Sequence, residues 1–154
     1  MSRAIIDADS YMYRAAISCK ELIEIEPEVW YEAYILNNAR NYLKDTMKEL
    51  ASKVGCSEYV MVTGWSGINF RKVINPSYKS NRKQQQRPIM LEKVKAMCME
   101  EFPMCYIPHL EADDTCRILL EENKDNVVVS IDKDLRTFSG KIYDSYHDTM
   151  RFIT

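Results

Sequence analysis

The chain has 154 residues, of which 46% are hydrophobic and 29% are charged, a composition typical of a globular protein with one domain. No apolar run approaches the length of a membrane-spanning helix, and a strand-like N-terminus with two aspartates argues against a secretory signal. The five cysteines are widely spaced and form no CxxC pair. They are expected to be reduced, mostly buried thiols of a cytosolic protein, and a structural zinc site is not expected.

Apolar periodicity and turn residues predict alternating strands and helices. Pro27 and Pro88 are expected at helix starts, and Gly55 is the expected stop of the longest helix. In chain order the predicted elements are a strand at 3–6, helices at 10–24 and 29–54, a strand at 58–63, a helix at 88–102, a strand at 104–107, a helix at 112–123, a strand at 125–131 and a hairpin of 141–144 with 149–153.

This alternation predicts the α/β class, with a mostly parallel central sheet flanked by helices. Ligands of such sheets bind beyond the carboxyl ends of the strands. Asp7 and Asp132 directly follow predicted strands, and Glu111 follows another after three residues. We therefore expect one pocket to collect the acidic residues Asp7, Glu111, Asp113, Asp114, Asp132 and Asp134.

Carboxylates gathered in this way repel one another unless a cation lies between them. A set of oxygen ligands suits Mg²⁺ or Mn²⁺ better than zinc. A single pair such as Asp113-Asp114 is often no more than a helix start or a solvated turn. Three acidic groups in matching positions at strand ends favour a metal site instead.

The net charge of −2 hides an asymmetry. The segment from Arg71 to Lys95 holds eight basic residues and one acidic residue, and carries +7, which leaves −9 for the rest of the chain. A basic segment on an acidic body suggests a polyanion held over the metal site. A solvated loop and helix face is the alternative interpretation.

Four blocks of sequence resemble the 5′→3′ exonuclease and flap endonuclease family, which has a PIN-like nuclease core, and are most similar to its small phage members. The blocks are Ile5-Ile6-Asp7-Ala8-Asp9-Ser10 with Tyr13-Arg14-Ala15, Asn69-Phe70-Arg71-Lys72 with Pro76-Ser77-Tyr78-Lys79-Ser80-Asn81-Arg82, Leu110-Glu111-Ala112-Asp113-Asp114, and Ser130-Ile131-Asp132-Lys133-Asp134-Leu135. The resemblance covers residues 4–138. It implies a single PIN-like nuclease domain over residues 1–154, with a clipped helical arch at about residues 71–102.

The resemblance also implies a function, which is metal-dependent hydrolysis of DNA at 5′ ends, flaps and junctions of single-stranded with duplex DNA. The six acids would hold two Mg²⁺ or Mn²⁺ ions, and Lys79 and Arg82 would be catalytic. Tyr78 would stack on a base. The residues expected to bind nucleic acid are Arg71, Tyr78, Lys79, Arg82, Lys83 and Arg87, the last by general phosphate attraction. The implied location is the cytoplasm of a bacterial or phage-infected cell.

Two departures from the family leave alternatives open. The family commonly has an aspartate just after the second strand, where Thr63-Gly64-Trp65-Ser66 offers none. Asp9 is expected at the surface or as a helix cap rather than as a substitute. The family also continues into a C-terminal helical module that grips duplex DNA. The chain is therefore also interpreted as half of a split nuclease, a weakly active or inactive binding subunit that needs a partner chain with that module. A PIN-type ribonuclease acting on single-stranded RNA is the other alternative.

Overall fold

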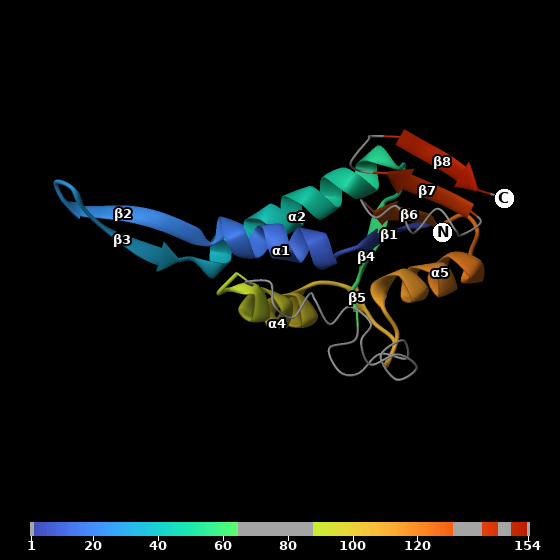
Figure 1. Ribbon diagram of the computed structural model, residues 1–154. Helices are drawn as coiled ribbons and strands as arrows, with labels where there is room; N and C mark the ends of the chain where they lie inside the picture. Colours follow the sequence, from blue (N-terminus) through green and yellow to red (C-terminus); the bar gives the residue numbers. More distant parts are fainter. Residues whose placement is uncertain (1, 65–87, 131–139, 145–148, 154) are drawn as a thin grey trace.

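A central sheet with helices on both faces forms the body of the molecule, and a separate hairpin extends from it (Figure 1). The computed structural model describes residues 2–64, 88–130, 140–144 and 149–153. Its elements are β1 (Arg3–Asp7), α1 (Asp9–Ser18), β2 (Lys20–Glu26), β3 (Val29–Tyr34), α2 (Leu36–Lys53), β4 (Glu58–Val62), α4 (Leu91–Glu101), β5 (Met104–Cys105), α5 (Ala112–Glu122), β6 (Val127–Ser130), β7 (Gly140–Asp144) and β8 (Thr149–Ile153).

The sheet has the strand order β5-β4-β1-β6-β7-β8. Five strands run parallel, and only β8 is antiparallel to its neighbour β7. The predicted α/β fold with a mostly parallel sheet is thereby confirmed, as is the predicted pairing of the last two strands. The chain adds β4 and β5 on one side of β1 and then β6 and β7 on the other side. The order therefore reverses beside β1, which is where parallel sheets bind ligands.

The central strands are buried on both faces, which explains their continuous apolar runs. Ala4, Ile5 and Ile6 of β1 are fully buried, as are Val128 and Val129 of β6. One face packs against α1, α2 and α4, whose contribution to the core includes Met12, Leu43, Met47 and Val94. The other face packs against α5 through Cys116 and Leu120. Because α5 is alone on its face among the described helices, its position depends on these two buried side chains and their neighbours.

The prediction of helix at residues 19–24 and 29–35 is wrong. Residues 20–26 and 29–34 pair as the antiparallel hairpin β2–β3, which projects far from the sheet in Figure 1. Its turn passes through Glu28, which has a positive φ of 66°. Apolar residues recur at helical spacing from Trp30 onward, and the same spacing continues through α2. The two segments therefore looked like one long helix in the sequence. Ile23, Ile25 and the aromatic residues of β3 favour strand, and this local preference prevails.

The base of the hairpin is closed by hydrogen bonds to α1 and α2. The Ile35 amide donates to the Cys19 carbonyl over 2.8 Å, and Asn38 Nδ2 donates to Glu21 Oε1 over 2.7 Å. The hairpin therefore begins and ends at one point of the body. Beyond that point it exposes Leu22, Ile25, Val29, Trp30, Tyr31 and Tyr34.

Several local predictions are confirmed. Gly55 has a φ of +76° just after α2, as a helix stop requires. All five cysteines are free, and four of them are buried, with Cys105 half-buried. The arch-like segment lies only partly within the described residues, since α4 covers its second part and residues 71–87 lie outside. No helix in the described part of the chain is long and apolar enough to cross a membrane.

Candidate metal and nuclease site

Asp7 ends β1 at the point where the strand order reverses. It lies between the ends of β4 and β6, because β1 pairs with both strands in parallel. From β6, the hydroxyl of the buried Ser130 donates to Asp7 Oδ2 over 3.2 Å. This contact joins residues 123 apart in the sequence. The predicted position of Asp7 at the end of the first strand is therefore confirmed, and its part in a ligand site stays a prediction.

The first turn of α5 brings further carboxylates to the same edge of the sheet. Asp113 and Asp114 lie in that turn, and Glu111 is the extended residue that precedes the helix. The Asp114 amide donates to Asp113 Oδ1 over 2.9 Å, and the Thr115 amide donates to the Glu111 carbonyl over 3.2 Å. The partial positive charge of a helix N-terminus stabilises acids in this position. The three acids are half-buried, so their charges are only partly screened by water.

Cys116 is a buried residue of α5, two positions after Asp114. Burial is the main cause that raises the pKa of its thiol well above the ordinary value. The negative charges of Asp7, Asp113 and Asp9 raise that pKa further. The structure places Asp7 at the end of β1 and Asp113 in the first turn of α5, and their shared cation site stays a prediction.

Asp9 reaches the site in a way that the sequence did not reveal. It is exposed, as expected, but it lies in the first turn of α1 and is not the cap residue, which is Ala8. Its Oδ1 accepts a hydrogen bond of 2.7 Å from Thr63 Oγ1, and its Oδ2 accepts one of 3.4 Å from the Gly64 amide. A carboxylate therefore lies at the end of β4 although β4 is not followed by an acid. The only signal in the sequence was the Asp7-Ala8-Asp9 spacing at a strand-to-helix corner.

The residues present fit a hard divalent cation. Every side chain named at this edge offers oxygen, the donor that Mg²⁺ and Mn²⁺ prefer. Within the described ranges no three Asp, Glu, His or Cys side chains come close enough to form a metal-holding group by themselves. Mg²⁺ does not require such a group, because it commonly uses one or two carboxylates and keeps several waters. Asp132 and Asp134 lie outside the described residues, so the complete ligand set stays a prediction.

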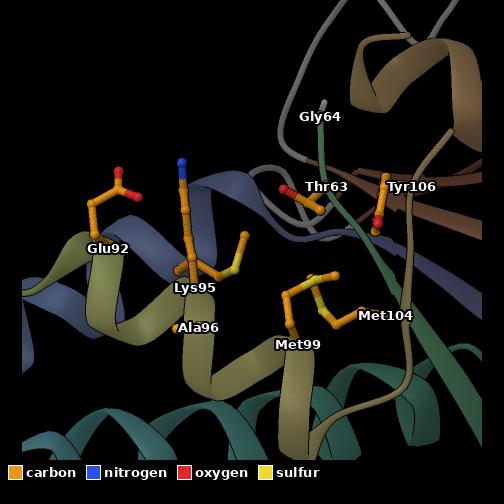
Figure 2. Close-up of a pocket in the computed structure, with 9 residues that line it drawn as sticks. Thr63, Gly64, Glu92, Lys95, Ala96, Met99, Met104 and Tyr106 are labelled. Carbon is orange, nitrogen blue, oxygen red and sulfur yellow. The ribbon is translucent and has the colours of Figure 1, made fainter. Parts of the chain in front are cut away.

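A pocket of about 440 Å³ adjoins the acids. Figure 2 shows Glu92 and Lys95 of α4 on one side, Thr63 and Tyr106 on the other, and Met99 and Met104 between them. Gly64 forms part of the pocket wall and also touches the acidic site. A Cβ atom added to Gly64 would lie 3.6 Å from Asp9 Oδ2 and 3.7 Å from the Ala112 amide nitrogen. The pocket therefore opens beside the carboxylates rather than at a separate place.

The residues predicted to bind nucleic acid cannot be placed relative to these acids. Arg71, Tyr78, Lys79, Arg82, Lys83 and Arg87 all lie outside the described residues. Their predicted roles stay predictions.

The helix α4 that follows them is held to α2 by a two-pronged ion pair. Arg40 Nε donates to Glu101 Oε1 over 2.9 Å, and Arg40 Nη2 donates to Glu101 Oε2 over 3.0 Å.

The structure thus has acids at the carboxyl edge of a mostly parallel sheet, and comparison with known proteins shows the family of the chain. Residues 2–151 match the family described as the 5′-3′ exonuclease N-terminal resolvase-like domain, and the chain belongs to this family. It is 27% identical over 143 residues to the exodeoxyribonuclease of Enterobacteria phage T3, covering 86% of this chain and 47% of that protein. The exonuclease of Escherichia phage T7 is also 27% identical over 143 residues, with 48% of that protein covered.

Solved structures of similar proteins share the fold. A phage T5 flap endonuclease in complex with DNA and metal ions superposes with a TM-score of 0.67 at 16% identity, over 99% of this chain and 58% of that one. The catalytic core of Rad2 with a DNA substrate has a TM-score of 0.53 at 18% identity, over 99% of this chain and 46% of that one. At these identities the likeness shows the fold alone. The chain spans about half the length of the two phage relatives above.

Proposed function

We propose that this chain hydrolyses phosphodiester bonds of DNA at 5′ ends or flaps, with Mg²⁺ or Mn²⁺ as cofactor. The observation that carries the proposal is the position of Asp7 at the end of β1, where the strand order reverses and Ser130 of β6 donates a hydrogen bond of 3.2 Å to its carboxylate. Membership of the exonuclease family supports it. The curated phage relatives are an exodeoxyribonuclease and an exonuclease, and a T5 neighbour was solved with DNA and metal ions.

In this proposal, the acids of β1 and α5 bind the first cation and position the scissile phosphate. Asp7, Glu111, Asp113 and Asp114 would hold that ion, and Asp132 and Asp134 a second one. Bound cations of this kind lower the pKa of a water molecule and offset the charge of the phosphate. The five parallel strands of the sheet supply rigidity, since Asp7 directly follows the fully buried residues Ala4, Ile5 and Ile6 of β1.

The basic segment supplies positive charge where the reaction develops negative charge. We assign this role to Lys79 and Arg82, and general attraction of the DNA backbone to Arg71, Lys83 and Arg87. Tyr78 would stack on a base. The pocket beside Gly64 has a volume within the range of small-molecule sites, about 300 to 1,000 Å³. With Lys95 and Tyr106 in its walls, it suits the nucleotide that adjoins the scissile phosphate.

The test compares cleavage of a 5′-flap DNA with cleavage of single-stranded RNA of matched sequence, in Mg²⁺, in Mn²⁺ and in a chelator. We expect metal-dependent cleavage of the flap. The double variant Asp113→Asn, Asp114→Asn should lose it. Asp125→Asn is the matched control, because Asp125 is an exposed acid at the opposite end of β6. Flap cleavage that persists in the chelator or in the double variant would refute the proposed site, and preferential cleavage of the RNA would favour the ribonuclease alternative.

A second candidate is a nucleic-acid-binding subunit with little activity of its own. The feature that favours it is the stretch Thr63-Gly64-Trp65-Ser66, which has no acid where the family commonly has an aspartate. In this case flap DNA binds without being cleaved. A partner chain carrying a helical module should then raise both affinity and rate, because the second contact becomes intramolecular. The same cleavage assay, repeated with such a module added in trans, separates the two candidates.

The state of the cysteines suggests where this reaction takes place. All five thiols are free, as expected in a reducing compartment. We propose that the chain acts in the cytoplasm of a bacterial or phage-infected cell, where its DNA substrates would be found.

A further inference from the structure

The corner between β1 and α1 is fixed to the end of β4 by three hydrogen bonds. The Ala8 amide donates to the Val62 carbonyl over 2.9 Å. The next residue, Asp9, accepts the Thr63 hydroxyl at 2.7 Å and the Gly64 amide at 3.4 Å. Both carboxylate oxygens of Asp9 are engaged in this way. The side chain is therefore held in one orientation although it is exposed to solvent.

The same corner touches the turn that carries the acids of α5. Gly64 is close enough to α5 that an added Cβ would lie 3.7 Å from the Ala112 amide nitrogen and 4.0 Å from the Cα of Glu111. Asp9 thus contacts Gly64, and Gly64 packs on the residues immediately before Asp113. The position of Asp9 is coupled through one glycine to the acidic turn.

We propose that Asp9 is a positioning residue of the cation site. Thr63 and Gly64 aim its carboxylate, which adds negative charge at the end of β4, next to the end of β1 that carries Asp7 and next to the turn that precedes Asp113. This inference rests on the proposed function. With both oxygens already hydrogen-bonded, Asp9 acts on the cation through the waters that the ion retains and through its effect on Gly64, rather than as a direct ligand. It supplies charge at the end of β4, where Val62, Thr63 and Gly64 offer none.

A purely structural role for Asp9 makes a different prediction, so the two can be separated. Asn in place of Asp9 keeps an oxygen that accepts the Thr63 hydroxyl, but it removes the charge and the acceptor of the longer 3.4 Å bond from the Gly64 amide. Val in place of Thr63 keeps the charge but removes the hydroxyl that aims it, and Ser in place of Thr63 keeps both. If Asp9 only holds the corner in place, loss of its hydrogen bond should lower the melting temperature, and loss of its charge should not change the Mn²⁺ requirement. A charge that serves the cation is sensitive chiefly to the Asn substitution.

The measurement is the rise of the melting temperature with Mn²⁺ concentration, recorded without DNA on the full chain. We expect Asp9→Asn to need about tenfold more Mn²⁺ than the parent for the half-maximal rise, as is typical when an outer partner of a metal site is lost. Thr63→Val should need more Mn²⁺ by a smaller factor. Thr63→Ser should match the parent, and so should the control Asp125→Asn. The metal-free melting temperature of each variant reports any structural loss separately.

The inference is overturned if Asp9→Asn needs the same Mn²⁺ concentration as the parent for the half-maximal rise. It is also overturned if the increase for Asp9→Asn is no larger than that for Asp125→Asn. If Asp9→Asn fails to fold, Thr63→Val decides, because the inference requires its Mn²⁺ midpoint to rise and Thr63→Ser not to follow. A parent chain without any Mn²⁺ response would instead contradict the proposed function, so the two failures are distinguishable.

Discussion

Substituting Gly140 by Ala should destabilise the protein more than any other Gly to Ala change among its described glycines. Gly140 begins β7 with a φ of +132°, a conformation that residues with a side chain rarely adopt, and this strain costs about 1–3 kcal/mol. A Cβ atom there would lie 2.7 Å from Leu120 Cδ2 and 3.0 Å from its Cγ. Leu120 is fully buried on α5 and has little room to yield, so overpacking adds about 1–3 kcal/mol. The free energy of unfolding should fall by about 2–6 kcal/mol.

Urea unfolding followed by far-ultraviolet circular dichroism measures this loss. Gly55→Ala is the matched control, because Gly55 also has a positive φ, +76°, but nothing lies within 4 Å of its added Cβ. It should cost about 1–2 kcal/mol from backbone strain alone. Leu120→Ala removes the clashing atoms, so the double variant with Gly140→Ala should be more stable than additivity predicts, by about 1–3 kcal/mol. A cost at Gly140 equal to that at Gly55, or strict additivity with Leu120→Ala, would refute the reasoning.

Three further predictions test other parts of the molecule. Burial raises the pKa of the Cys98 thiol from 9.0 to about 12, so the folded state retains this proton longer than the unfolded state. Stability should therefore fall as the pH rises from 9.0 toward 12, and Cys98→Ala should reduce that slope in pH-dependent urea titrations. Replacing residues 20–34 by a short glycine turn should leave the helix content and the Mn²⁺ response nearly intact, since Cys19 and Ile35 already meet at the hairpin base. The same deletion should reduce self-association on gel filtration, because it removes the exposed apolar side chains of the hairpin. Lys79→Ala and Arg82→Ala should each lower the slope of DNA affinity against salt by about one unit in binding titrations, and a retained parent slope would favour the solvated-face interpretation.

The sheet was predictable because its strands are buried on both faces. A continuous apolar run such as Val127, Val128 and Val129 predicts a central strand that is buried on both faces. An acid directly after such a strand must lie at the carboxyl edge of the sheet. The same logic located Asp7 and the acidic turn of α5. It failed for the hairpin, because β2 and β3 are exposed on both faces and show no alternation of buried and exposed residues. There the β-branched and aromatic residues were the better guide. Pro27, which was expected to start a helix, lies in the turn between β2 and β3.

The role of Asp9 was beyond the sequence for a different reason. Whether a residue in the first turn of a helix points to solvent or to a neighbouring strand depends on the angle at which the helix leaves the sheet. That angle is set here by the Ala8 to Val62 hydrogen bond, a contact between residues far apart in the chain. The acids of α5 needed no such information, because the start of a helix that follows a parallel strand lies at the carboxyl edge of the sheet.

The contact between Asp7 and Ser130 joins residues 123 apart in the sequence, so the surroundings of Asp7 form only after most of the chain has folded. Local elements such as β2–β3 close early, whereas contacts of high sequence separation form late because chain entropy opposes them. A nascent or truncated chain that lacks β6 therefore has Asp7 on a strand with one edge unpaired and no partner hydroxyl to orient it. The proposed nuclease activity would therefore begin only when nearly all of the sheet has assembled, at the final stage of folding.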